Sequence, residues 1–182
     1  MASKKKSIVF TGSSIIALWE DLSSYFPGFF VLNTAIGGSQ THDILASLDK
    51  LVISNSPDII CYYCGSNDLN NGRTVKAIVE NVKTTYDSLR KHLDNPIFIY
   101  LSIIKAPQKM DRWDMVDKIN AEMSSFEKDL VDFEFIDINP VFFFQDGKPR
   151  MDFYQEDQLH LMPAAYAAMG EFLVPRIMAR IS

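Results

Sequence analysis

The stretch SIVFTGSS, residues 7–14, joins a short β-branched and aromatic run to a glycine and two adjacent serines. The run predicts a strand, and a helical pattern starts after the serines, so they lie at a strand-to-helix turn. Two hydroxyls at such a turn can cap the helix, hold a phosphate or attack an acyl group. The remaining sequence has to decide among these three roles.

Four more runs of this kind follow, and longer segments of helical period separate them: FFVLNTA, DIICYYCG, PIFIYLSII and FEFIDIN. Strands that alternate with helices favour a parallel sheet. The runs are almost continuously apolar, which indicates burial on both faces. We therefore predict an α/β fold, a three-layer α/β/α doubly wound, flavodoxin-like domain with a five-stranded parallel sheet. The length of 182 residues suits one domain spanning residues 1–182.

Two helices are predicted in detail. Between the third and fourth runs, apolar residues from Val75 to Leu93 recur at spacings of three and four, after the turn signal Asn71-Gly72. A last helix should begin at Pro163, a favoured first helical residue, and Pro175 should kink it.

Composition limits the function classes. The formal net charge is −5, and the only basic cluster, Lys4–Lys6, does not continue, so a nucleic acid partner has little electrostatic support. No apolar run reaches the roughly 20 residues of a membrane span. The basic start is interrupted by residues 11–14 and has no small-residue cleavage pattern, so we expect a cytoplasmic protein rather than an exported one.

The sequence offers no metal site. Cys61 and Cys64 are three apart on a predicted strand, so their side chains point to opposite faces, and we expect both to be buried thiols. His42 and His92 have no Cys or His partner at ligand spacing and are expected on helices or the surface.

In doubly wound sheets the ligand site lies beyond the carboxyl ends of the strands. Ser14 follows the first strand, and the segment QEDQLHL, residues 155–161, follows the fifth. Within one irregular turn Asp157 can hold the Nδ1 proton of His160 and leave Nε2 facing a nucleophile, although such a pair on its own is more often a simple loop hydrogen bond.

Acyl transfer also needs donors for the developing oxyanion. Gly38 in AIGGSQ offers an unobstructed backbone N–H, and Asn67 in GSND offers a carboxamide N–H. Considered singly, Gly38 is better explained as a turn glycine, and Asn67 as a helix-capping or turn asparagine.

The segments FTGSSI, NTAIGGSQ, YYCGSNDL and DQLHL occur in the order of the four blocks of the SGNH, or GDSL-type, esterase and lipase family, which this chain resembles from residue 10 to residue 162. The resemblance implies that Ser14 is the nucleophile, His160 the general base and Asp157 its orienting carboxylate. It also implies an oxyanion hole formed by Gly38, Asn67 and the N–H of Ser14. Ser13 stands where the family has an aspartate, and we expect it to cap the following helix.

These observations favour a cofactor-independent serine ester hydrolase that acts through an acyl-enzyme on short acyl or acetyl esters. The alternative from another class is a flavodoxin-like module in which TGSS binds a phosphate or a flavin. A small-molecule ester is the expected partner, and homo-oligomerisation stays open. Candidate substrate-pocket residues are aromatic, with packing in the core or at a dimer contact as the competing interpretation: Trp19, Phe142, Phe143 and Phe144.

Overall fold

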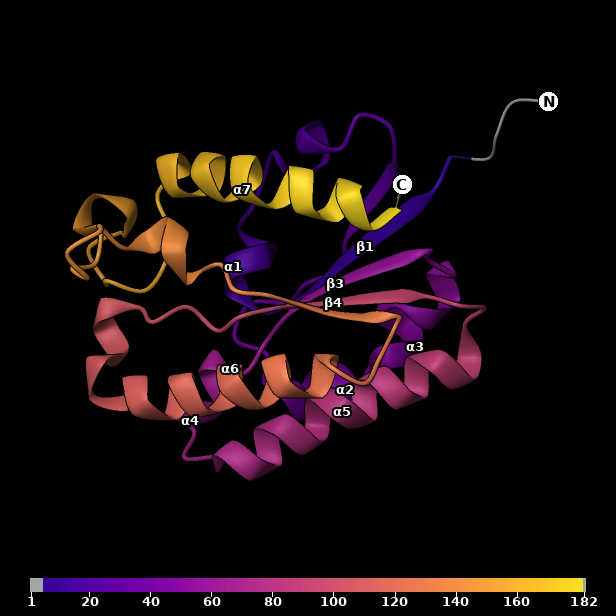
Figure 1. The fold of residues 1–182 in the computed structure, drawn as a ribbon, viewed down its shortest axis with the longest axis horizontal. Helices are drawn as coiled ribbons and strands as arrows, with labels where there is room; N and C mark the ends of the chain where they lie inside the picture. The colour runs from indigo at the N-terminus through magenta and orange to yellow at the C-terminus, as the bar shows by residue number, and fades with distance from the viewer. Residues whose placement is uncertain (1–4, 182) are drawn as a thin grey trace.

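The computed structural model describes residues 5–181, and Lys4 of the basic cluster lies outside this range. Its centre is a five-stranded parallel sheet with strand order β2-β1-β3-β4-β5. The five predicted runs all contain a strand, and helices cover both faces of the sheet (Figure 1), so the predicted fold class is confirmed. The strands are β1 (Ser7–Gly12), β2 (Phe30–Asn33), β3 (Ile59–Tyr63), β4 (Ile97–Leu101) and β5 (Phe133–Ile136).

Two hydrophobic cores sandwich the sheet because successive side chains of a strand point to opposite faces. In β3, Cys61 and Tyr63 pack in one core, and Ile60 and Tyr62 pack in the other. The first core lies under α1 (Ser14–Ala17), the 3-10 helix η1 (Leu22–Tyr25) and α7 (Pro163–Ile181). The second lies under α2 (Thr41–Ala46), α3 (Leu48–Leu51), α4 (Ser66–Asn70), α5 (Val75–His92) and α6 (Trp113–Glu127).

Short 3-10 helices make up much of the remaining chain. They are η2 (Ile53–Asn55), η3 (Pro107–Arg112), η4 (Asn139–Phe142) and η5 (Met151–Phe153). Of these, η3 follows β4, while η4 and η5 lie between β5 and α7. They therefore belong to the loops at the carboxyl ends of the strands, where a doubly wound fold binds ligands.

The two helices predicted in detail are present. The long helix α5 begins at Val75, and the Thr74 hydroxyl caps it by accepting a hydrogen bond from the N–H of Ala77 at 3.2 Å. Helix α7 begins at Pro163 as expected and runs through Pro175 to Ile181. Both cysteines are free thiols and buried, which confirms the expectation for them.

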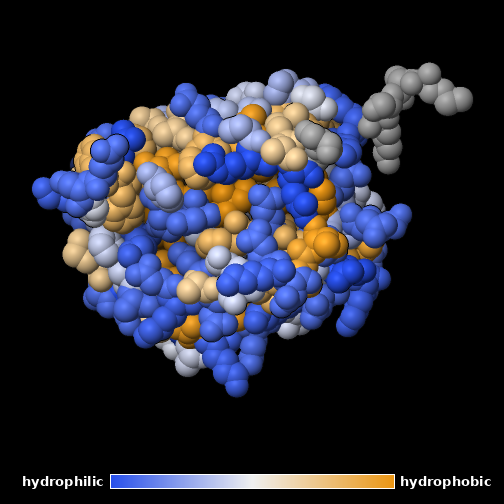
Figure 2. Space-filling model, in the orientation of Figure 1, coloured by the Kyte–Doolittle hydropathy of each residue, from blue (hydrophilic) through white to orange (hydrophobic). Residues whose placement is uncertain are grey.

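Hydrophilic residues cover most of the face shown in Figure 2, with hydrophobic residues visible between them in its middle. Among the described residues no helix is both long and apolar enough to cross a membrane.

Candidate active site

Gly12 makes the turn after β1 possible. Its φ is +130°, a conformation that favours glycine, and a Cβ built there would lie 1.9 Å from the carbonyl oxygen of Tyr63. The chain can therefore pass close to β3, where the N–H of Ser13 donates to the Tyr63 oxygen at 3.0 Å. This turn places Ser14 as the first residue of α1, at the carboxyl edge of the two central strands.

Ser13 occupies the N-cap position of α1, but its side chain makes no capping hydrogen bond. Its carbonyl accepts the N–H groups of Ile16 and Ala17 instead, at 3.1 and 3.0 Å. The side chain is 1% exposed. The structure therefore differs from our expectation: Ser13 caps the helix through its backbone carbonyl and not through its side chain.

Asp157 and His160 form a bonded pair in the loop before α7. The Nδ1 atom of His160 lies 2.5 Å from Oδ2 of Asp157, and Oδ1 accepts the backbone N–H groups of Leu159 and His160 at 3.0 and 2.9 Å. The loop is closed by a bridge between Tyr154 and Leu161. One carboxylate thus fixes both the backbone of the turn and the ring of His160.

These contacts affect the charge of Asp157. Desolvation raises the pKa of the Asp157 carboxyl, but the hydrogen bonds from the N–H groups of His160 and Leu159 and from the His160 ring together lower it below its usual value. Asp157 is therefore ionised at neutral pH. A proton on Nδ1 is held by this carboxylate, which leaves Nε2 of His160 as an acceptor.

The nucleophile candidate stands apart from this pair. Within residues 5–181 the Ser14 hydroxyl has no hydrogen-bond partner, so no bond joins it to His160. Both side chains are partly exposed. The structure thus brings together Asp157 and His160 by direct contact and places Ser14 at the carboxyl edge of the sheet without such a contact.

Gly38 and Asn67 lie on two loops that are bonded to each other. The Nδ2 atom of Asn67 donates to the carbonyl oxygen of Ser39 at 3.0 Å. Gly38 is exposed and has a φ of +81°. An amide NH₂ carries two hydrogens, so Asn67 keeps one for another acceptor.

A buried carboxylate strengthens this connection. Asp68, which is fully buried, accepts the Thr41 N–H at 3.0 Å and the Thr41 hydroxyl at 2.6 Å. The Nδ2 atom of Asn81 in α5 donates to the same hydroxyl at 2.9 Å. Residues 38–41 and 66–68 are therefore held as one unit.

The predicted aromatic pocket residues occupy different environments. Trp19 and Phe142 are 1% and 0% exposed and belong to the core under α7. Phe144 is half exposed, with the Arg150 guanidinium over its ring. Phe143 packs edge-on against Trp113 with ring centroids 5.7 Å apart. Their part in substrate binding stays a prediction.

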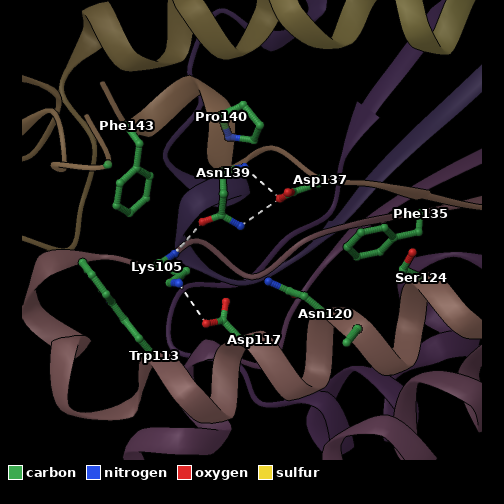
Figure 3. Close-up of a pocket in the computed structure, with 12 residues that line it drawn as sticks. Lys105, Trp113, Asp117, Asn120, Ser124, Phe135, Asp137, Asn139, Pro140 and Phe143 are labelled. Carbon is green, nitrogen blue, oxygen red and sulfur yellow. Dashed lines mark hydrogen bonds and ion pairs between the residues drawn. The ribbon is translucent and has the colours of Figure 1, made fainter. Parts of the chain in front are cut away.

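Phe143 lines a pocket of about 530 Å³ between α6 and the segment after β5 (Figure 3). Trp113 faces it across the opening, and Lys105 pairs with Asp117 at 2.8 Å on the pocket wall. The amide of Asn139 is bonded to Asp137 and to the Lys105 N–H. Most polar groups of the wall are thus already paired within the protein.

Among residues 5–181 no cluster of three or more His, Cys, Asp or Glu side chains could hold a metal ion. His42 contacts Asp43 at 3.2 Å, and Nδ1 of His92 lies 2.8 Å from the Ser88 carbonyl oxygen at the end of α5.

Several residues that contact the site were not identified from the sequence. Asp68 and Thr41 each stand beside a predicted motif, but only the fold shows that they bond each other. Lys109 is 1% exposed and bonds Ser66. Nothing in the segment APQKMDR distinguishes this lysine from an ordinary surface lysine.

Comparison with known proteins gives a family and a fold. The sequence model of the GDSL-like Lipase/Acylhydrolase family matches residues 11–168. No curated protein matches the chain.

Three solved structures resemble the chain over nearly its whole length. A lipase/acylhydrolase from Enterococcus faecalis has a TM-score of 0.80 and 22% identity, covering 96% of each chain. A GDSL-like lipase from Bacteroides thetaiotaomicron has a TM-score of 0.80 and 18% identity, covering 98% of this chain and 91% of its own. A mutant of an acetylxylan esterase from Geobacillus stearothermophilus has a TM-score of 0.77 and 14% identity, covering 94% of each chain. At these identities the likeness shows the fold.

Proposed function

Because the chain belongs to the GDSL-like lipase/acylhydrolase family, we propose that it is a serine-dependent carboxylic ester hydrolase of the EC 3.1.1 class, with Ser14, His160 and Asp157 as its triad. The observation that carries this proposal is the 2.5 Å contact between His160 Nδ1 and Asp157 Oδ2. A carboxylate in this position selects the tautomer in which Nε2 can accept a proton. Family membership favours this reading over the flavodoxin-like binding module.

In the proposed reaction Ser14 Oγ attacks the ester carbonyl carbon while Nε2 of His160 takes the hydroxyl proton. The tetrahedral oxyanion accepts hydrogen bonds from the N–H groups of Ser14 and Gly38 and from the free amide hydrogen of Asn67. His160 then gives its proton to the leaving alcohol, and an acyl-enzyme remains. Water repeats the sequence and releases the acid. No cofactor enters these steps.

The geometry supports this assignment of donors. Gly38 has open space where a Cβ would stand, so a substrate oxygen can approach its N–H. The single bond from Asn67 to Ser39 fixes the direction of its amide and leaves the second hydrogen free. Both residues are connected through the Thr41–Asp68 contact, which preorganises them before substrate binds.

We propose short acyl or acetyl esters as substrates. An esterase for acetylated xylan is among the structures of the same fold, and a small leaving sugar would suit a partly exposed serine. Phe143 and Phe144, on the segment before the catalytic loop, are the candidates for contact with the acyl or alcohol group; Trp19 and Phe142 act by packing beneath the site.

The test is hydrolysis of p-nitrophenyl esters from acetate to decanoate, and of an acetylated xylo-oligosaccharide, by the protein and its Ser14→Ala variant. Ser13→Ala is the matched control, since it removes the neighbouring hydroxyl, which has no hydrogen-bond partner among the described residues. We expect Ser14→Ala to lose activity with unchanged circular dichroism while Ser13→Ala keeps it. Equal activity in Ser14→Ala and the parent would contradict the assignment of the nucleophile.

A further inference from the structure

Two charged side chains are almost completely buried among the described residues, and both belong to the Asn67 region. Asp68 is 0% exposed and Lys109 is 1% exposed. Burial of a charge is costly unless hydrogen bonds compensate for the lost water. Asp68 has such bonds from Thr41. Lys109 has no place in the proposed triad or oxyanion hole, so its burial calls for another explanation.

The ammonium group of Lys109 forms both of its hydrogen bonds with one residue. Its Nζ donates to the carbonyl oxygen of Ser66 at 2.8 Å and also to the Ser66 hydroxyl. Ser66 is the first residue of α4, and its carbonyl belongs to the same peptide unit as the N–H of Asn67. A cation on that carbonyl therefore fixes the peptide that leads directly into Asn67.

The helix that carries Asn67 needs outside support. Helix α4 has five residues, and a helix this short is unstable without tertiary contacts. Arg112, from the same 3-10 helix as Lys109, donates to the Leu69 carbonyl at 3.0 Å and to Asn70 Oδ1 at 2.9 Å. Thus η3 holds α4 at both ends.

The same segment also contacts the loop of the proposed base. The N–H of Gln108 donates to the Gln158 carbonyl at 3.1 Å, and Gln158 lies between Asp157 and His160 with a φ of +56°. One short segment, η3, therefore bonds both the helix that carries Asn67 and the loop that carries His160.

From these contacts we infer that Lys109 is a positioning residue for the oxyanion hole: it holds the Ser66 carbonyl and thereby orients the Asn67 amide toward the reacting carbonyl oxygen. The inference rests on the proposed function. On the other side of Asn67, Asp68 is bonded to Thr41, so a buried cation and a buried anion fix the residues that flank the amide donor. The positive charge of Lys109 also favours a developing negative charge nearby.

The charge of Lys109 can change in an ordinary pH range. Burial lowers its pKa to about 8, and the neighbouring positive charge of Arg112 acts in the same direction, whereas Asp68 opposes them. Above this pH the amine still bonds Ser66, but its positive charge is lost. Because the positive charge of Lys109 takes part in the proposed role, we expect kcat to fall as the pH rises through about 8.

The test compares two variants. Lys109→Met keeps an unbranched side chain, one atom shorter, and removes the charge, and Lys118→Met changes a lysine on the exposed face of α6. Since loss of a whole oxyanion donor lowers kcat by roughly 10²–10³-fold, we expect Lys109→Met to lower it by about 10- to 100-fold. KM should change little, because the substrate carbonyl binds the donors most strongly in the transition state. Lys118→Met should match the parent.

The pH profile separates positioning from plain stabilisation. The parent should show an alkaline limb in kcat near the pKa of Lys109, and Lys109→Met should lack it. A variant with lower thermal stability but unchanged kcat and an unchanged alkaline limb would overturn the inference.

A fluorophosphonate probe, which bonds to the serine oxygen as fluoride leaves, distinguishes the two proposals. Labelling of the parent but not of Ser14→Ala supports the proposed function, and slower labelling of Lys109→Met supports the inference. Equal rates of labelling in the parent and in Lys109→Met would overturn the inference alone. A parent that is not labelled and has no esterase activity would overturn both the proposed function and the inference. If Lys109→Met does not fold, Ser66→Ala, which removes one acceptor of the ammonium, takes its place in the kcat and labelling measurements.

Discussion

The imidazole of His160 and the carboxylate of Asp157 contact each other at 2.5 Å although both are partly or largely exposed to solvent. A solvent-exposed contact between two polar side chains contributes little to stability because water competes for both partners. The geometry here depends less on that pair than on the two backbone N–H groups that bind the other carboxylate oxygen. The loop is therefore organised around Asp157, and the ring of His160 is oriented as a result.

Replacement of Asp157 by Asn should separate orientation from folding. The amide can still accept the two backbone N–H groups, so we expect the unfolding temperature to change little. An amide that offers N–H to Nδ1 favours the wrong tautomer of His160, and kcat should fall by about 10³- to 10⁴-fold. Ester hydrolysis and thermal unfolding of the same preparations would check both expectations. Unchanged kcat would remove Asp157 from the mechanism.

Gly12→Ala should disrupt the turn that presents Ser14. The added Cβ would lie 1.9 Å from the Tyr63 carbonyl oxygen, at a φ that L side chains rarely adopt. Because the obstacle is the backbone of the central strand β3, it cannot move away without breaking the sheet. We expect a loss of roughly 3 kcal/mol or more in the free energy of unfolding, measured by urea denaturation.

Gly28→Ala is the matched control for this variant, because a Cβ there meets nothing within 4 Å. It should change the urea midpoint only slightly. Similar losses in the two variants would show that the close approach to Tyr63 is unimportant.

Thr41→Val should loosen the link between the two oxyanion loops. The valine keeps the shape of the side chain but leaves the buried Asp68 carboxylate without its 2.6 Å donor and Asn81 without its acceptor. We expect a loss of about 1–3 kcal/mol in the free energy of unfolding and a lower kcat. Thr84→Val, which removes an exposed hydroxyl bonded to Glu80 within α5, should affect neither. Equal effects of the two substitutions would contradict a role for the Thr41–Asp68 contact.

The strands and the burial of both their faces could be predicted because the local sequence encodes these features. The apolar run at residues 59–63 predicts a strand buried on both faces, and all five residues are buried. The spacing of Asp157 and His160 likewise predicts their contact, since three residues span one turn.

The hydrogen bonds that hold the site in place could not be predicted, because they join residues far apart in the sequence. Lys109 and Ser66 are 43 residues apart, and Thr41 and Asp68 are 27 apart. A lysine carries no sign in the sequence that it will be buried, since long charged side chains lie mostly at the surface. The capping role expected for Ser13 is likewise not observed: Ser13 occupies the N-cap position and is 1% exposed, but its side chain makes no capping hydrogen bond.

The pKa of Lys109 predicts how stability depends on pH. Burial and the charge of Arg112 lower this pKa from 10.5 to about 8 in the folded protein. Between these two values the unfolded chain binds a proton that the folded chain lacks, so the free energy of unfolding rises with pH. For this group alone, the increase from about pH 7.5 to about pH 9.5 should be about 1–2 kcal/mol.

Burial raises the pKa of Cys61 and of Cys64, which works in the opposite direction in this range because the unfolded thiols lose their protons first. Comparison with Lys109→Met cancels these contributions, since both proteins contain the same cysteines. Urea denaturation of the two proteins across this range should show the parent gaining stability relative to the variant as the pH rises. A constant difference between them would mean that Lys109 titrates near its ordinary pKa, and that its burial carries no penalty for the charged form.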